Sequence, residues 1–128
     1  MKKTKVLFLS AWYPHRYDAM EGLFVQKHAW AASRYTDVCV LFLLADKNIT
    51  DYEIVTNKNQ GVLETIVYYP KRVGLLRKIV TYFRAFQKGY THVLSNWGKP
   101  KVTHAHILTR TGFLAYIKKK KYGIPYII

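Results

Sequence analysis

The chain has 128 residues, half of them hydrophobic, so its composition predicts one domain with a buried core and excludes a disordered chain. The single cysteine, Cys39, excludes an intrachain disulfide, and no apolar run approaches the roughly 20 residues that span a bilayer. Because the first residues also lack a signal-peptide pattern, the sequence predicts a cytoplasmic protein.

The formal net charge of +14 is unevenly distributed along the chain. All seven acidic residues lie within residues 1–64, whereas residues 65–128 contain thirteen Lys or Arg residues and no acid. A field of one sign concentrates anionic partners, such as nucleic acid, acidic lipid or a phosphorylated substrate. The alternatives are a basic surface without a dedicated partner, or a fragment whose acidic half lies elsewhere.

Strand-like and helix-like segments alternate along the chain. In chain order we expect a strand at Lys5–Ser10, a helix at Gly22–Tyr35, strands at Val38–Leu44, Tyr52–Thr56 and Val62–Tyr69 (ended by Pro70), a helix at Leu75–Trp97, a strand at Lys101–Ile107, a helix at Arg110–Tyr122 and a strand from Pro125 to Ile128. This order predicts a single α/β domain over residues 1–128, with a Rossmann-like, doubly wound, mostly parallel sheet.

Each of the first two predicted helices has apolar residues at helical spacing. In the first they are Leu23, Phe24, Ala31 and Ala32, with His28 at the same spacing. In the second they are Leu76, Ile79, Val80, Phe83, Phe86, Tyr90, Val93, Leu94 and Trp97.

The loop Ala11–Glu21 follows the first predicted strand and opens into a helix. Open α/β sheets bind ligands at the carboxyl ends of their strands, so this loop is a candidate site. Its candidate ligand contacts are Arg16 to a phosphate, Trp12, Tyr13 and Tyr17 to a sugar or base, and Gly22 at the helix start. The alternative is a packed surface loop that covers the sheet edge. A GxGxxG fingerprint and a P-loop are both absent.

Two histidines lie at the end of a later predicted strand. His104 and His106 are two residues apart and therefore share one side of the strand. Near a carboxyl end, His106 could hydrogen-bond a substrate hydroxyl or phosphate, whereas His104 could instead be a core histidine under the next helix. Because no further metal-ligating residue lies nearby in the sequence, we predict no metal site.

Two segments combine cations with aromatic residues: Lys71–Lys88 and the run Lys118–Lys121 with Tyr122. Their cations are candidates for contact with an anionic membrane or another polyanion: Lys78, Arg84, Lys118, Lys119, Lys120 and Lys121. The alternative is that these cations form a solvated face opposite a core that contains Phe83 and Phe86. The two interpretations are compatible.

The segments VLFLSAWYPHRYDAMEGLFVQKHAWAASRYTDVCVLFL, VTHAHI and TGFLAYIKKKKYGIPYII, in this order, resemble the N-terminal half of family-4 glycosyltransferases, which are retaining enzymes of the GT-B fold. The resemblance extends over the chain and is weakest at Ala45–Trp97. It implies that this domain binds the acceptor across a cleft from a C-terminal donor-binding domain that the chain lacks. The apolar end, Ile124–Ile128, also suggests the front part of a longer protein.

The resemblance assigns roles to individual positions. Gly22 matches a glycine that approaches the donor diphosphate, although Glu21-Gly22-Leu23 stands where many members have two adjacent glycines. His106 matches the second histidine of a strand end at the cleft. Tyr126–Ile128 matches the strand before a family histidine that lies beyond this chain, so the catalytic residues are expected downstream and the chain is expected to be inactive alone.

The implied activity is transfer of a sugar, with retention, from a nucleotide-sugar donor to a saccharide or lipid-linked acceptor. The resemblance implies no metal and no cofactor, and it suggests cell-surface polysaccharide or glycolipid synthesis at the inner face of the cell membrane. The alternative function is a basic Rossmann-like module that binds nucleic acid or another polyanion. No motif for specific nucleic-acid recognition is present.

Overall fold

A computed structural model describes residues 3–106, 119, 121 and 123–127. Its centre is one mixed sheet of six strands in the order β3-β4-β2-β1-β5-β6. The strands are β1 (Lys5–Ser10), β2 (Asp37–Asp46), β3 (Glu53–Asn59), β4 (Val62–Pro70), β5 (Val102–His106) and β6 (Tyr126–Ile127). All neighbouring strands are parallel except β3 and β4, which form an antiparallel hairpin. The predicted α/β class is confirmed.

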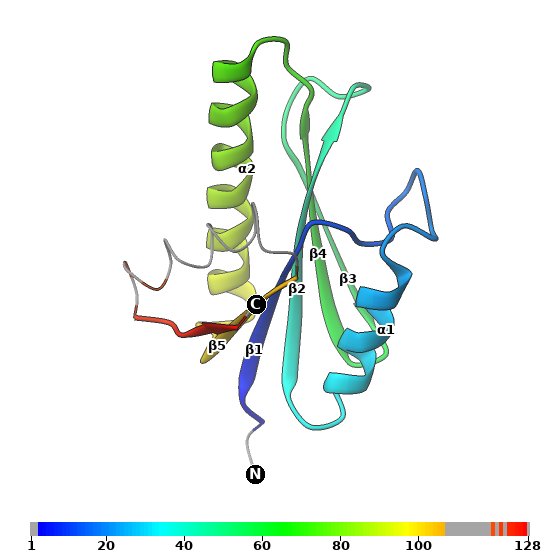
Figure 1. Cartoon of the computed structure of the whole chain (residues 1–128), viewed down its shortest axis with the longest axis vertical. Coiled ribbons are helices and arrows are strands. Elements are labelled where there is room, and N and C mark those ends of the chain that lie inside the picture. The colour runs from blue at the N-terminus through cyan, green and yellow to red at the C-terminus, as the bar shows by residue number, and fades with distance from the viewer. Residues whose placement is uncertain (1–2, 107–118, 120, 122, 128) are drawn as a thin grey trace.

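Two helices cover opposite faces of this sheet, α1 (Leu23–Ala32) and α2 (Leu75–Asn96) (Figure 1). Because side chains alternate along a strand, β1 and β2 contribute to a separate core on each face. On the α1 face the buried residues include Phe8, Phe42 and Val25, and on the α2 face they include Leu41 and Phe86. The two central strands are therefore buried on both sides.

The helical spacing noted for α1 did not identify its buried face. The structure buries Val25, Gln26 and Ala29, whereas Phe24 is 63% exposed and His28 is exposed. This helix has apolar residues on most of its circumference, so its periodicity does not select one face.

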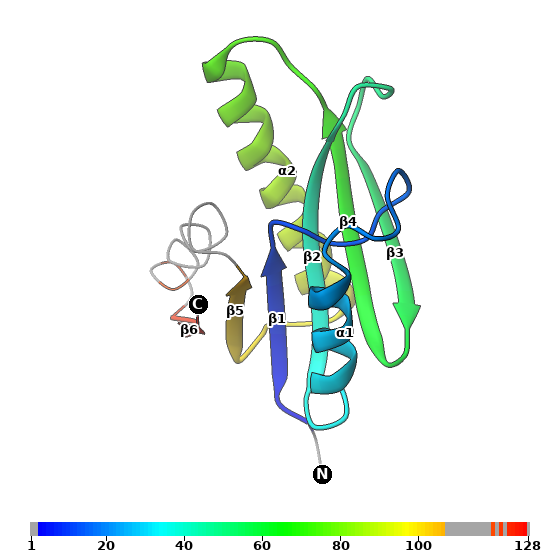
Figure 2. The ribbon, with the colours of Figure 1, turned by 45° about the vertical axis from the view of Figure 1, so that its right-hand side comes forward.

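The apolar stripe of α2 is buried only in part. From Thr81 onwards the helix packs on the sheet through Ala85, Phe86, Tyr90 and Val93. Its beginning does not, because residues 71–80 are all exposed, and Figure 2 shows the first turns of α2 leaning away from the sheet. The expected stripe therefore extends past the edge of the core.

The remaining differences concern element ends. β3 is antiparallel and longer than the predicted strand Tyr52–Thr56, since a tight turn at Gln60 and Gly61 joins it to β4. The predicted helix Arg110–Tyr122 lies outside the described residues except Lys119 and Lys121, which are helical. Neither α1 nor α2 is both long and apolar enough to cross a membrane.

Because β2 is buried on both faces, we expect a core substitution in this strand to lower the stability of the fold strongly. Leu41→Ala should lower the free energy of unfolding by about 2–5 kcal/mol, because Leu41 is 2% exposed between β2 and α2. Urea denaturation of the purified chain measures this. The matched control is Leu75→Ala, which should change the free energy by no more than about 0.5 kcal/mol because Leu75 is 76% exposed. Equal effects would contradict the burial described.

Candidate functional site

The order of strands reverses between β1 and β5. The chain runs from β1 through α1 to β2 on one side of β1, and later from β4 through α2 to β5 on the other side. Ser10 and His106, the last residues of the two strands, are register partners. Open α/β sheets bind ligands beside such a reversal, at the carboxyl ends of the strands. The backbone of His106 therefore lies at the same edge as the start of the loop Ala11–Glu21.

Gly22 allows this loop to fold back on the end of β1. Its φ is +62°, and a Cβ atom at this position would lie 2.5 Å from the carbonyl carbon of Trp12 and 2.6 Å from the amide nitrogen of Tyr13. The glycine is thus required by contact between two backbone segments. This contact places the start of α1 directly against Trp12. The Ser10 hydroxyl also donates a hydrogen bond to the Trp12 carbonyl oxygen and accepts one from the Trp12 backbone N–H.

Tyr13 anchors the loop to the core, because its side chain is only 1% exposed. Its hydroxyl donates a hydrogen bond to the buried carboxylate of Glu64, which also accepts one from the Gln26 side-chain amide at 2.9 Å. Burial, reinforced by the bond to Glu64, raises the pKa of Tyr13 well above its ordinary value. Tyr13 is therefore a structural residue, and the packed-loop interpretation holds for it.

A second anchor fixes the outer part of the loop. The Arg16 guanidinium lies 2.7 Å from the Asp46 carboxylate at the end of β2 and 3.1 Å from that of Glu53 in β3. It also lies 3.7 Å from the centre of the Tyr68 ring, and the Tyr17 hydroxyl donates to Asp46 at 2.7 Å. Because its guanidinium is paired with both carboxylates, Arg16 positions the loop and is not a free phosphate ligand in this structure.

The Asp46 carboxyl group takes part in this anchor in its ionised form. Burial raises the pKa of its carboxyl, but hydrogen bonds from the Asn48 backbone N–H, Tyr17 and Arg16 outweigh burial, so the pKa lies below its ordinary value. The sequence singled out Arg16 and Tyr17 but not Asp46 or Glu53. Their role depends on strand pairing between distant segments, which no local pattern records.

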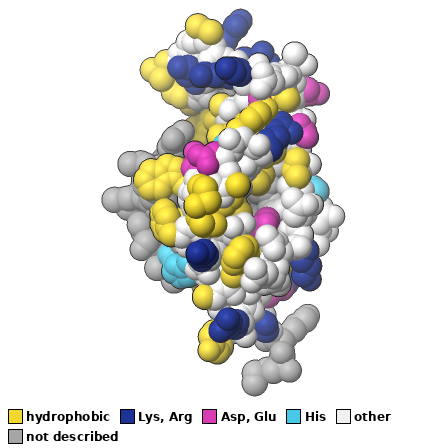
Figure 3. Space-filling view, turned by 90° about the vertical axis from the view of Figure 1, so that its right-hand side faces the viewer, with side chains coloured by type: hydrophobic (Ala, Val, Ile, Leu, Met, Phe, Trp, Pro, Cys, Tyr) yellow, Lys and Arg dark blue, Asp and Glu magenta, His cyan; other side chains and the backbone are white. Residues whose placement is uncertain are grey.

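The residues left exposed around this ordered loop are mainly apolar. Trp12 is 49% exposed, Tyr17 54%, Met20 70% and Phe24 63%, and the Trp12 and Phe24 rings meet edge to face at 6.5 Å. Hydrophobic side chains gather on the face that carries α1 (Figure 3). Of these exposed side chains, the sequence singled out Trp12 and Tyr17 as candidate ligand contacts but not Met20 or Phe24.

Strand β5 carries two histidines, His104 and His106. His104 is half-buried, with its ring 5.1 Å from Phe8 and 5.8 Å from His28. Burial, together with the neighbouring His28, lowers the pKa of His104. For His106 the structure describes only the backbone position. Within the described part of the chain, no three His, Cys, Asp or Glu side chains are grouped to hold a metal ion.

The predicted polyanion contacts belong to two segments that are far apart in the sequence. Lys78 and Arg84 are exposed on α2, and Lys119 and Lys121 are exposed near the C-terminal end. Lys118 and Lys120 lie outside the described residues.

Comparison with known proteins gives no assignment: no family model matches the chain, and no curated protein or solved structure is significantly similar to it. Its function must therefore be inferred from its own residues, their geometry and the motifs described above.

The contact at Gly22 predicts a specific loss of stability. A non-glycine residue at positive φ costs roughly 1–2 kcal/mol, and Gly22→Ala should cost more because its Cβ would also overlap the Trp12 backbone. Gly61→Ala is the control, since Gly61 has φ +83° but its Cβ would be no closer than 3.4 Å to Ser33. Chemical denaturation should show the larger loss for Gly22→Ala, and equal losses would contradict the proposed overlap.

The Asp46 anchor predicts an acid-sensitive loop. Because the folded-state pKa of Asp46 is lowered, its contribution to stability is complete above the ordinary carboxyl pKa of about 4 and is lost as pH falls through the lowered value. Asp46→Asn should therefore reduce the loss of stability between pH 5 and pH 2, measured by urea denaturation, and Tyr17→Phe should reduce it less. An unchanged pH profile in Asp46→Asn would contradict this role.

Proposed function

We propose that this chain is the acceptor-binding domain of a retaining glycosyltransferase, with the Rossmann-like, doubly wound architecture of one half of a GT-B fold. The observation that carries the proposal is the reversal of strand order between β1 and β5, where an ordered aromatic loop and the end residue His106 share one sheet edge. The motif resemblance supports the same position as one wall of a cleft. Helices on both faces of a mainly parallel sheet are compatible with this architecture.

Each part of the edge has a role in this proposal. The exposed rings of Trp12, Tyr17 and Phe24 offer apolar faces for packing against sugar rings. His106 would hydrogen-bond an acceptor hydroxyl. The start of α1 at Gly22 has no side-chain cap and no acid in its first turn, so its positive dipole end suits the donor diphosphate held by a facing domain.

The reaction would exchange one bond at the anomeric carbon for another. The bond to the leaving diphosphate oxygen breaks, and a bond to the acceptor hydroxyl oxygen forms on the same face of the sugar. The proton of the acceptor hydroxyl leaves with the diphosphate or with a base. This domain would contribute acceptor orientation and part of the electrostatic stabilisation of the leaving group.

The decisive experiment uses the product of the complete reading frame that contains this chain. Incubated with a panel of nucleotide sugars and with saccharide or lipid-linked acceptors, it should transfer a sugar with retention of anomeric configuration, which NMR of the product determines. His106→Ala should lower kcat/KM for the acceptor roughly tenfold, the effect of losing one hydrogen bond of about 1.4 kcal/mol. Trp12→Ala should raise the KM for the acceptor.

The control is Tyr35→Ala, because Tyr35 is 82% exposed and follows the C-terminal end of α1, away from the loop. It should leave kcat/KM unchanged. If the complete product neither binds nor turns over any nucleotide sugar, the glycosyltransferase assignment is wrong. Salt-sensitive RNA binding in its place would favour the polyanion-binding alternative.

A further inference from the structure

The beginning of α2, with the segment before it, forms an exposed apolar projection. We call residues 71–80 the α2 tip, and every residue in it is exposed. Five aliphatic side chains of the tip are exposed, three of them by three quarters or more: Val73 at 88%, Leu75 at 76%, Leu76 at 75%, Ile79 at 44% and Val80 at 41%. A cluster of exposed apolar side chains on a projecting helix is typical of an interaction site.

The α2 tip is also strongly cationic. It carries Lys71, Arg72, Arg77 and Lys78 among its ten residues, and no acid occurs anywhere after Glu64. The helix start adds to this charge, because Gly74 provides no side-chain cap and the first turn contains no acid. A second copy of the tip would be repelled by these cations, so the tip does not suit self-association.

The residue types in the α2 tip distinguish between two anionic partners. Single-stranded nucleic acid is bound by stacking on aromatic side chains, and the exposed apolar residues of the tip are all aliphatic. Aliphatic side chains flanked by Lys and Arg are typical of helices that lie in the interface of an anionic bilayer. Lys71 and Arg72 precede the helix, and Arg77 and Lys78 follow the two leucines.

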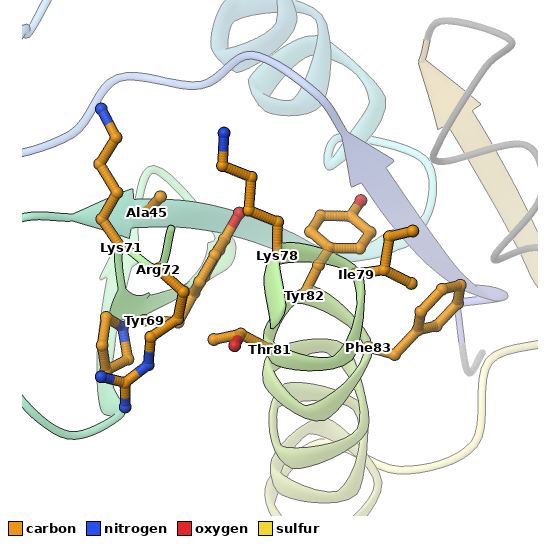
Figure 4. Close-up of a pocket in the computed structure, with 10 residues that line it drawn as sticks. Ala45, Tyr69, Lys71, Arg72, Lys78, Ile79, Thr81, Tyr82 and Phe83 are labelled. Carbon is orange, nitrogen blue, oxygen red and sulfur yellow. The ribbon is translucent and has the colours of Figure 1, made fainter. Parts of the chain in front are cut away.

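A pocket at the base of the α2 tip has matching chemistry. Its volume is about 380 Å³, and its walls include Tyr69 from β4 and Ile79, Tyr82 and Phe83 from α2. Lys71 and Lys78 extend toward the same side of this pocket (Figure 4). An apolar hollow with cations at its edge fits the glycerol region and the negatively charged headgroup of a single phospholipid.

From these observations we propose that the α2 tip docks on an anionic phospholipid bilayer, with Val73, Leu75 and Leu76 in the acyl boundary and the four cations on the headgroups. The basic and hydrophobic side chains at the upper end of the molecule in Figure 3 lie on this side. Docking of this kind does not require the chain to transfer sugars.

The docked bilayer would lie beside the candidate site. The backbone N–H of Lys71 donates to the carbonyl oxygen of Asp46 at 3.3 Å, and Asp46 also holds Arg16 and Tyr17. The tip therefore starts next to the anchor of the loop Ala11–Glu21. An acceptor presented at a membrane surface would reach the loop from this side.

Vesicle binding by the full chain tests the proposal. In sedimentation assays the chain should bind vesicles of phosphatidylcholine with phosphatidylglycerol and bind pure phosphatidylcholine vesicles much more weakly. Leu75→Ser with Leu76→Ser should weaken binding about tenfold for each leucine. Lys71→Ala with Lys78→Ala should weaken binding to the anionic vesicles roughly fivefold per cation, and high salt should have a similar effect.

Matched controls separate the tip from general charge and hydrophobicity. Lys58→Ala with Lys101→Ala removes two exposed cations beside the starts of β4 and β5, at the opposite end of the sheet from the tip, and Tyr35→Ser removes an exposed apolar side chain elsewhere. These variants should retain most of the binding. Circular dichroism should be unchanged in all variants, because the substituted residues are exposed.

A fluorescent label reports whether the tip enters the bilayer. Cys39 is fully buried, and its burial raises the pKa of its thiol to about 12, so a dye should react only with an introduced cysteine. An environment-sensitive dye on Leu75→Cys should shift to the blue with anionic vesicles, whereas the dye on Tyr35→Cys should not. Wild-type-like vesicle binding by the double-serine variant would overturn the proposal. So would leucine-dependent binding of RNA or self-association without vesicle binding.

Discussion

The central constraint on this molecule is that β1 and β2 are buried on both faces. An amphipathic strand can place polar residues on one side, but these two strands have apolar residues on both, so each face needs a helix. This requirement places α1 and α2 on opposite sides of the sheet. The crossover through α1 leads from β1 to β2 on one side of β1, and the crossover through α2 leads from β4 to β5 on the other side, so the strand order reverses at the candidate site.

The loop Ala11–Glu21 is ordered by this architecture and not by its own sequence. Tyr13 reaches a carboxylate in β4, Arg16 reaches carboxylates at β2 and β3, and Gly22 returns the backbone to the end of β1. These contacts pair the Tyr13 hydroxyl and the Arg16 guanidinium, and the surface that the loop exposes is largely apolar. A surface prepared in this way loses little conformational entropy when it binds a ligand, which favours affinity.

The long helix α2 contributes to the core at one end and to an exposed projection at the other. Its later turns pack on the sheet through Ala85, Phe86, Tyr90 and Val93, whereas its first turns extend beyond the core. The same apolar periodicity therefore belongs to the core in one part and to an exposed projection in the other. Because a helix is stiff, the anchored later turns hold the projection in a fixed direction relative to the loop.

The sequence alone determined the α/β class and the positions of most strands and helices, because buried apolar runs and long helical periodicity are local signals. It also located the first loop and the histidine-bearing strand end at one edge, since carboxyl ends of parallel strands meet. It did not determine which face of α1 is buried, that Arg16 is held by Asp46 and Glu53, or where the stripe of α2 leaves the core. These were decided by tertiary structure, because they depend on which distant segments become neighbours and on where the sheet ends, and neither is encoded in the spacing of residues along one element.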